Sequence, residues 1–437
     1  MDALIIEEHR TQNKEQKYLK KKPGWRLGKC VIFSVPATGH VNPSLALVEE
    51  LVKLGEKVIY YNSSKFKDVI TSTGAEFRDC STDLDALVDS SGMQFGKNMI
   101  GVAYVVLKSG IEIAGKVMDD IREEKPDYII RDIISSHGKI ISKALKIPLI
   151  TFSPVFAFED KKLPPKAPLF FILKTFGMVI TGFLNLLACF ALAGRAAKRY
   201  GFKRKELLYA YNDFSGLNII STTREFQYYP ELFPESRFKF CGPMFYQGRE
   251  KADFDFKTLP SDKIIYISLG TVYNKDIDFY RNCFKAFSGT DYSVIMSDPA
   301  CIAPLKEKPE NFVIRQYVPQ LQVLQRAKLF ITHSGMNSMH ESLYYGVPVI
   351  SVPQAADQFL IGKRAAALGA GIYMEKPTAD RLRKAADKIF GDPKYAAAAA
   401  KLGKGFREAG GAKAAAEDVI QYMRKMDQGL ERVESRE

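Results

Sequence analysis

Residues 329–348, LFITHSGMNSMHESLYYGVP, contain the feature that most constrains the fold of this chain. Leu329 to Thr332 form a short apolar run that predicts a buried strand, and Asn337 to Tyr345 have the pattern of a helix that stops at Gly346. A strand that enters a helix through a tight turn is the repeating unit of a doubly wound parallel sheet. The free N–H groups and the positive dipole end of such a helix also attract anions.

The turn between this strand and helix carries groups that suit a phosphate. His333 is placed to reach a phosphate oxygen, and Gly335 lets the backbone approach closely. Asn337 and Ser338 add short donors, while the carboxylate of Glu341 suits a vicinal diol such as a ribose. The alternative is an ordinary helix that is capped by Asn337 or by the serine before Gly335. The residues of this stretch alone leave both interpretations open.

The first half of the chain begins with a similar unit. An apolar strand ends at Val35, and a loop leads from it to a helix with Asn42 as its cap and Pro43 as its first residue. His40 lies in this loop, at the edge where parallel sheets bind ligands, although an isolated histidine there more often bonds its own turn. Asp132 follows another predicted strand, where an acid is often only a helix cap. Further strands are expected at 58–61, 128–130, 148–152, 218–222, 263–268, 294–297, 312–315, 347–352 and 371–374.

Length and composition restrict the class of protein. A chain of 437 residues is too long for one ordinary core, so two domains are expected, and 46% hydrophobic with 26% charged residues is typical of a soluble globular protein. Six scattered cysteines without a CxxC pair indicate reduced thiols and a cytoplasmic location. Residues 1–28 are a charged extension without the apolar core of a signal peptide. The net charge of +13 is spread along the chain without a nucleic-acid-binding motif, so no nucleic acid partner is expected.

The apolar segment 168–194 allows three interpretations. Thr175 to Gly194 contain no charge over a length that would span a bilayer. Asn185, several glycines and folded-domain patterns on both sides argue against a span. The segment could instead be a wall of an acceptor cleft, which is the preferred interpretation, or a helix that contacts a membrane surface, so peripheral membrane contact is possible.

A set of spaced residues after position 332 matches one known signature. Its members are His333, Gly335, Asn337, Ser338, Glu341, Ser342, Gly346, Val347, Pro348, Pro353, Asp357 and Gln358. Together they resemble the donor signature of UDP-dependent glycosyltransferases of the bacterial macrolide and flavonoid type. The resemblance extends from about Lys29 to Met426. It implies the α/β GT-B fold, in which two Rossmann-like doubly wound domains face each other across a cleft.

The resemblance also implies a division of the chain. The expected parts are an extension at 1–28, an acceptor-binding domain at 29–240, a linker at 241–260, a nucleotide-sugar-binding domain at 261–410, and a helix and tail at 411–437 that cross back to the first domain. The linker is expected to be polar between Tyr246 and Phe256.

The resemblance assigns roles to the candidate site residues. His40 corresponds to the catalytic base, and Asp132 to its acidic partner, on a shorter and weaker motif. For the donor, the turn of Ser268 and Thr271 lies beside the diphosphate, and Tyr317 stacks on uracil. Val318 and Gln320 read the edge of the base, His333, Gly335, Asn337 and Ser338 hold the phosphates, Glu341 holds the ribose, and Asp357 and Gln358 bond the sugar hydroxyls.

The activity implied is inverting transfer of a hexose, most simply glucose, from a UDP-sugar to a hydroxyl of a hydrophobic small molecule such as a phenol, flavonoid or macrolide. No metal and no cofactor besides the donor are expected, and the DxD patterns at 83–85, 253–255 and 276–278 are interpreted as surface charge. The alternatives are a deoxysugar donor on another nucleotide, a glycolipid-forming transferase, a sugar-nucleotide epimerase, and a non-catalytic membrane-associated lipid-binding protein.

Overall fold

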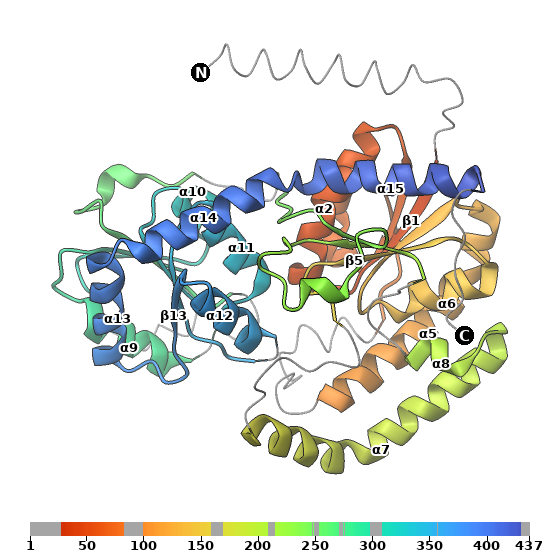
Figure 1. The fold of residues 1–437 in the computed structure, drawn as a ribbon, viewed down its shortest axis with the longest axis horizontal. Coiled ribbons are helices and arrows are strands. Elements are labelled where there is room, and N and C mark those ends of the chain that lie inside the picture. The colour runs from red at the N-terminus through yellow and green to blue at the C-terminus, as the bar shows by residue number, and fades with distance from the viewer. Residues whose placement is uncertain are drawn as a thin grey trace.

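A computed structural model of the protein contains two parallel α/β units side by side (Figure 1). It describes residues 28–82, 99–158, 169–208, 215–246, 248, 253–270, 274, 276–297, 308–355 and 357–429, except for the side chains at 99, 100, 169–182, 205 and 208.

The first unit is a seven-stranded parallel sheet in the order β3-β2-β1-β4-β5-β6-β7. Its strands are β1 (Lys29–Phe33), β2 (Lys57–Asn62), β3 (Glu76–Asp79), β4 (Tyr128–Asp132), β5 (Leu149–Ser153), β6 (Leu217–Ile220) and β7 (Phe238–Phe240). Its helices are α2 (Thr38–Lys53), α3 (Lys67–Thr71), α5 (Met99–Glu124), α6 (Ser136–Leu145), α7 (Leu169–Tyr200) and α8 (Arg204–Leu208).

The second unit is a six-stranded parallel sheet in the order β10-β9-β8-β11-β12-β13. Its strands are β8 (Ile264–Ser268), β9 (Ser293–Ser297), β10 (Phe312–Arg315), β11 (Leu329–Thr332), β12 (Val349–Ser351) and β13 (Gly371–Tyr373). Its helices are α9 (Ile277–Phe287), α10 (Gln320–Leu324), α11 (Met336–Tyr344), α12 (Gln358–Ala367), α13 (Ala379–Gly391) and α14 (Lys394–Glu408).

The central strands are mostly apolar and buried on both sides because helices cover both faces of each sheet. In the first sheet Ile32 pairs with Ile130, and in the second Ile267 pairs with Ile331, and all four are buried. This arrangement explains why the strands appear in the sequence as continuous apolar runs rather than as alternating patterns. The doubly wound α/β fold expected from the sequence is thereby confirmed.

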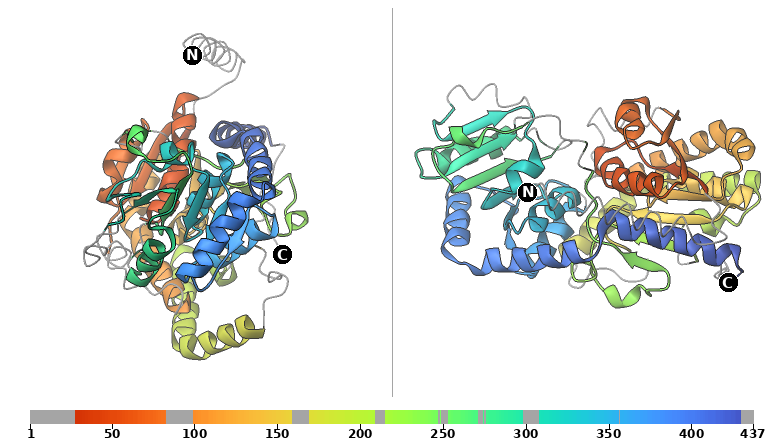
Figure 2. Two further views of the ribbon diagram at one scale, coloured as in Figure 1. Left: turned by 90° about the vertical axis from the view of Figure 1, so that its left-hand side faces the viewer. Right: turned by 90° about the horizontal axis from the view of Figure 1, so that it is seen from above.

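The last helix, α15 (Gly411–Asp427), joins the two units (Figures 1 and 2). It continues from α14 of the second unit and packs on α2 of the first, where Ala415, Ala416 and Val419 are completely buried. The backbone N–H of Gly411 donates to the carbonyl oxygen of Cys241 at 2.7 Å, which fixes the start of this crossing. The residue limits of the domains stay a prediction.

A second connection lies between residues 222–228 and the second unit. The Arg364 guanidinium on α12 donates to three consecutive backbone carbonyl oxygens, those of Glu225, Phe226 and Gln227. Because a planar guanidinium holds several acceptors in a fixed geometry, this contact fixes the position of one unit against the other. Beside it, the Tyr228 hydroxyl donates to the Leu360 carbonyl oxygen at 3.0 Å.

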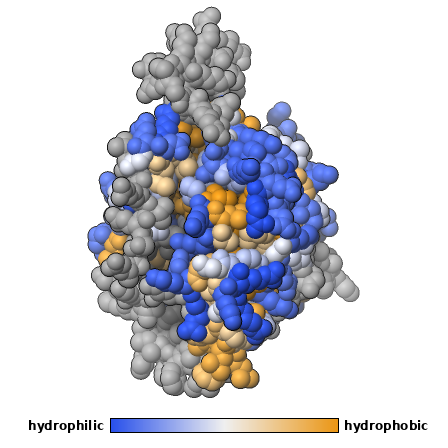
Figure 3. Space-filling view, turned by 90° about the vertical axis from the view of Figure 1, so that its right-hand side faces the viewer, coloured by the Kyte–Doolittle hydropathy of each residue, from blue (hydrophilic) through white to orange (hydrophobic). Residues whose placement is uncertain are grey.

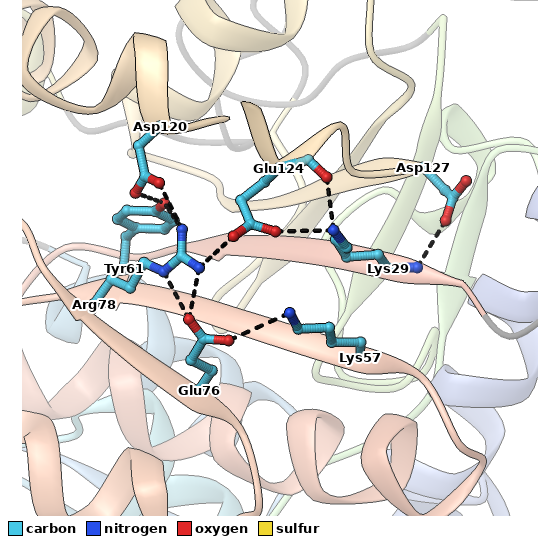
Figure 4. A network of polar contacts seen from close by, with 8 residues as sticks. All are labelled: Lys29, Lys57, Tyr61, Glu76, Arg78, Asp120, Glu124 and Asp127. Carbon is cyan, nitrogen blue, oxygen red and sulfur yellow. Dashed lines mark hydrogen bonds and ion pairs between the residues drawn. The ribbon is translucent and has the colours of Figure 1, made fainter. Parts of the chain in front are cut away.

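An ion-pair network ties α5 to the edge of the first sheet (Figure 4). Arg78 on β3 contacts the carboxylates of Glu76, Asp120 and Glu124 at 2.6, 2.7 and 2.5 Å. The Lys29 ammonium contacts the same Glu124 at 2.8 Å. Hydrogen bonds from Lys29 and Arg78 lower the pKa of Glu124 to about 2, so this carboxylate stays ionised.

Four expectations about local structure need correction. Helix α2 begins at Thr38, so His40 lies in its first turn and Pro43 inside the helix rather than at its start. Two edge strands, β3 and β7, were not expected, because they are short and less buried than the central strands. The expected polar linker is partly apolar, since Tyr246 and Phe254 are buried.

None of the described helices is both long enough and apolar enough to cross a bilayer.

Candidate active site

A cleft of about 550 Å³ lies between the two units, at the carboxyl ends of both sheets. Ligands of doubly wound sheets bind at this edge because the βα loops and helix N-termini meet there. The lining residues are Thr38, Gly39, His40, Asn42, Pro154, Val155, Tyr266, Ser268, Gly270, Ser297, Gln316, Tyr317, Val318, Gln320, His333, Gly335, Met336, Asn337, Ser338, Glu341, Asp357 and Gln358.

A histidine and a buried carboxylate form a pair on the first unit's side of the cleft. The Nδ1 atom of His40 lies 2.7 Å from Oδ2 of Asp132, which is the last residue of β4 and is 2% exposed. The other carboxylate oxygen accepts the backbone N–H of Ile134 at 3.0 Å. Both oxygens of Asp132 are therefore engaged, and the bond at Nδ1 leaves Nε2 of His40 as the nitrogen that can accept a proton.

Four effects set the proton affinity of His40. Burial lowers the pKa of its imidazole, but the charge and hydrogen bond of Asp132 and the charge of Asp357 outweigh burial, so the pKa is raised above its ordinary value. Asp357 belongs to the second unit, so the two halves of the molecule are electrostatically coupled across the cleft. This coupling between His40 and Asp357 could not be predicted from the sequence.

The opposite wall of the cleft is the start of α11, as the strand–turn–helix pattern predicted. The N-cap of this helix is Gly335, which has no side chain to cap the first N–H groups, so the alternative of a side-chain-capped helix is wrong. Such uncapped N–H groups and the helix dipole form an anion site.

His333 packs tightly into the same wall. A Cβ on Gly335 would lie 2.4 Å from Nε2 of His333, and one on Gly270 would lie 2.5 Å from its Cε1. Burial lowers the pKa of His333 to about 4, so the ring is neutral at physiological pH and acts through an N–H rather than a charge.

Asn337 lines the cleft and also makes a hydrogen bond that was not predicted from the sequence. Its Nδ2 donates to the backbone carbonyl oxygen of Gly39 at 3.1 Å, across the cleft. In an α-helix that oxygen would accept the N–H of the residue four positions later, which here is Pro43 and has no N–H. Asn337 thus occupies an acceptor that the proline leaves free, next to His40.

The nucleoside end of the cleft contains Tyr317 and a hydrogen-bonded group around Gln320. The Tyr317 side chain is 47% exposed and offers a stacking face. Gln320 Nε2 donates to Glu341 Oε2 at 2.5 Å and to Ser338 Oγ at 3.3 Å, and Gln320 Oε1 accepts from the Tyr266 hydroxyl at 3.1 Å. Gln320, which was expected to read the base, therefore holds the buried carboxylate of Glu341 in place.

Asp357 and Gln358 stand at the start of α12. The Oε1 atom of Gln358 accepts the backbone N–H groups of Gln354 at 2.8 Å and Ala355 at 3.0 Å. The acceptor of Gln358 is thus engaged, and its amide N–H groups remain for a ligand. Burial raises the pKa of Asp357, and the charge of His40 opposes this shift.

The structure brings nearly all of the candidate residues together. Every one of them lines the cleft except Asp132, which lies behind His40, and Thr271, which is outside the described residues. Other lining residues were not predicted as part of the site, among them Pro154, Val155, Tyr266, Ser297, Gln316 and Met336. Ser297 ends β9, so the rule that ligands bind at the carboxyl ends of strands could have identified it.

The described side chains of α7, which start at residue 183, do not line this cleft. The described part of the apolar segment therefore does not form a wall of the described cleft. The described parts of the chain also contain no group of three or more His, Cys, Asp or Glu side chains that could hold a metal. In two of the DxD patterns one acid caps a helical turn: Asp255 accepts from Lys257 N–H, and Asp276 from Phe279 N–H.

Two parallel Rossmann-like units facing across a cleft define the GT-B class of glycosyltransferase folds. Comparison with known proteins supports this class directly. The glycotransferase of kitacinnamycin has a solved structure that superimposes with a TM-score of 0.79, at 26% identity, over 91% of this chain and all of that one. Residues 282–424 match the family described as "Erythromycin biosynthesis protein CIII-like, C-terminal domain".

Two relatives in sequence align with about nine-tenths of this chain. The NDP-glycosyltransferase YjiC of Bacillus subtilis is 32% identical over 90% of this chain and 97% of its own length. An uncharacterised UDP-glucosyltransferase of the same organism, YojK, is 29% identical over 92% of this chain and 99% of its own. The chain therefore belongs to the bacterial NDP/UDP-glycosyltransferase family and is a glycosyltransferase.

Proposed function

We propose that this enzyme transfers glucose from UDP-glucose to a hydroxyl of a hydrophobic small molecule, with inversion at the anomeric carbon. The observation that carries the proposal is the His40–Asp132 pair at 2.7 Å, on the wall opposite the uncapped start of α11. A base on one wall and an anion site on the other leave a place between them for a sugar carbon.

In the proposed reaction, Nε2 of His40 takes the proton of the acceptor hydroxyl while the acceptor oxygen attacks the anomeric carbon. The bond from that carbon to the diphosphate oxygen breaks, and UDP leaves with the electron pair. Asp132 orients the imidazole and stabilises the imidazolium that forms. The leaving charge is met by the N–H groups at the start of α11 and by the neutral His333, so the proposal requires no metal ion.

We infer the donor substrate from the cleft residues of the second unit. Tyr317 stacks on the base, Glu341 accepts from the ribose hydroxyls, and Asp357 and the amide of Gln358 bond the hexose hydroxyls. The names of two relatives, an NDP-glycosyltransferase and a UDP-glucosyltransferase, support a nucleoside diphosphate sugar, with UDP-glucose as the simplest case. Because Tyr317 stacks on any pyrimidine, thymidine diphosphate sugars are the second candidate. Rates with UDP-glucose and dTDP-glucose at equal concentration decide between them.

We infer the class of acceptor from the cleft residues of the first unit. Pro154 and Val155 place apolar surface in the same cleft as His40. A phenolic or macrolide-like alcohol would rest on this surface with its hydroxyl toward the imidazole. One structural relative is named the glycotransferase of kitacinnamycin, and this name supports a small-molecule acceptor.

The test is His40→Ala with UDP-glucose and a phenolic acceptor. We expect loss of transfer by a factor of roughly 10³ or more, because the base is removed, while UDP affinity measured by calorimetry changes only a few-fold. Near-normal turnover of the variant contradicts the assignment of the base. Release of UDP by the wild-type protein only when acceptor is present separates transfer from epimerisation, and the anomeric configuration of the product by NMR tests inversion.

A further inference from the structure

The outward face of α7 carries an apolar stripe that the described cleft does not use. The exposed fractions are 53% for Phe183, 79% for Leu184, 49% for Leu187 and 39% for Phe190. Among the described residues, the only other exposed large apolar side chain is Tyr317, which lies in the cleft. Four such side chains on neighbouring turns of one helix form a patch, whereas ordinary surface exposure is scattered.

The opposite face of the same helix is firmly packed. Ala193, Ala196 and Ala197 are buried, and α7 contacts α5 and α8. The helix forms the lower edge of the molecule in Figure 1 and in the left view of Figure 2, and an apolar patch is visible at that edge in Figure 3. The stripe is therefore held outward by a fixed helix.

The segment of chain that carries the stripe has charges of one sign only. Residues 161–205 contain ten lysines and arginines and no aspartate or glutamate. Arg195, Lys198 and Arg199 are exposed on the last turns of α7, and the guanidinium of Arg204 lies 5.8 Å from the ring centre of Phe190. Apolar and cationic groups thus occupy one continuous surface.

We propose that α7 docks this enzyme on an anionic lipid surface. Phe183, Leu184 and Leu187 would enter the boundary between headgroups and acyl chains, and Arg195 and Lys198 would contact lipid phosphates. A helix that combines an apolar stripe with a basic flank binds in the plane of such a surface. Pairing of two copies through this face would bring two strongly positive segments together, which opposes self-association.

The proposal is tested by flotation of the full chain with two kinds of vesicle, phosphatidylcholine alone and phosphatidylcholine with an equal part of phosphatidylglycerol. We expect binding to the anionic vesicles, weakened by added salt because exposed charges are screened. Leu184→Gln with Leu187→Gln should weaken binding about tenfold or more, since apolar surface is removed without a change in charge.

Charge is tested by Arg195→Glu with Lys198→Glu, which should abolish flotation. The matched control is Lys384→Glu with Lys388→Glu, at exposed positions of the remote helix α13. This double variant has the same change in net charge, and we expect it to bind the anionic vesicles like the wild type. Thermal melting and UDP calorimetry check that each variant is folded with an intact donor site. If the leucine variant unfolds, the arginine–lysine pair decides, since both of its side chains are exposed.

Three results overturn the proposal: no flotation of the wild type with anionic vesicles, equal flotation with both kinds of vesicle, or flotation that neither α7 variant reduces. Sedimentation that shows a wild-type dimer converted to monomer by the leucine variant would assign the face to a second copy instead. None of these results affects the proposed transferase activity, which is measured separately with soluble substrates.

Discussion

At the residue scale, the His40–Asp132 pair determines how activity depends on pH. A protonated imidazole cannot accept the acceptor proton, so activity falls as the pH drops through the pKa of His40. Because Asp132 and Asp357 raise this pKa, the loss begins at a higher pH than the ordinary histidine value of about 6.5 would give.

Asp132→Asn removes the charge but keeps the size of the side chain. We expect the acid limb of the pH–rate profile to move to lower pH, because burial is then less opposed, and the maximum rate to fall by roughly 10²–10⁴ through misorientation of the base. The measurement is kcat/KM against pH for the variant and the wild type. An unchanged profile and rate would reduce Asp132 to the role of a helix cap.

A second residue-scale effect concerns Asn337 and the carbonyl of Gly39. Asn337→Ala removes the cross-cleft hydrogen bond of 3.1 Å and should lower kcat by roughly three- to tenfold. If Asn337 only satisfies the acceptor, then Pro43→Ala, which supplies an N–H within α2, should restore the rate in the double variant. If Asn337 holds the two units together beside His40, the double variant should stay slow. Steady-state kinetics of the four proteins distinguish the two outcomes.

At the element scale, the need for glycine at the start of α11 comes from close contact rather than from the backbone geometry of Gly335 itself. Gly335 has a φ of −61°, which any residue adopts, so its necessity comes from space alone. A Cβ there would lie 2.4 Å from His333 Nε2, which is less than van der Waals contact allows.

Gly335→Ala should therefore displace His333 and weaken UDP binding, by about tenfold or more, because the anion site loses its shape. Calorimetric titration of UDP measures the effect. The matched control is Gly391→Ala at the end of α13, where an added Cβ meets no atom within 4 Å and UDP affinity should not change. Unaltered UDP affinity in Gly335→Ala would mean that the diphosphate does not approach this turn.

At the scale of the whole molecule, the cleft exists because the two units hold a fixed relative position. Arg364 contributes to this by donating to the carbonyl oxygens of residues 225–227, and α15 contributes by packing on α2. The donor wall belongs to the second unit alone, whereas transfer needs both walls.

Arg364→Ala should consequently separate binding from turnover. We expect UDP affinity within a few-fold of wild type and kcat lower by roughly ten- to a hundredfold, because a misplacement of about 1 Å between base and donor is enough to slow transfer. Lys363→Ala, at the neighbouring exposed position, is the control and should keep full activity. A parallel loss of UDP affinity in Arg364→Ala would show instead that the residue supports the donor site itself.

How much of this could be predicted from the sequence differs between fold and site. The central strands and the helix ends at Gly55 and Gly346 were predictable, because continuous apolar runs and glycines with positive φ are local signals. The start of α2 was not predictable, because Pro43 favours a first-turn position and the helix nevertheless begins at Thr38. The edge strands β3 and β7 were not predicted, because one side of each faces less apolar surroundings.

The sequence by itself determined the two doubly wound units and the residues of the donor motif. Both can be recognised from short local segments and from the spacing of residues within them. Only the tertiary structure decided which groups meet across the cleft: His40 with Asp132, the field of Asp357 on His40, and Asn337 on the carbonyl of Gly39. It also decided that the apolar stripe of α7 faces outward. These relations join residues far apart in the chain, and only the packing of the two units brings them within the few ångströms over which hydrogen bonds and charges act.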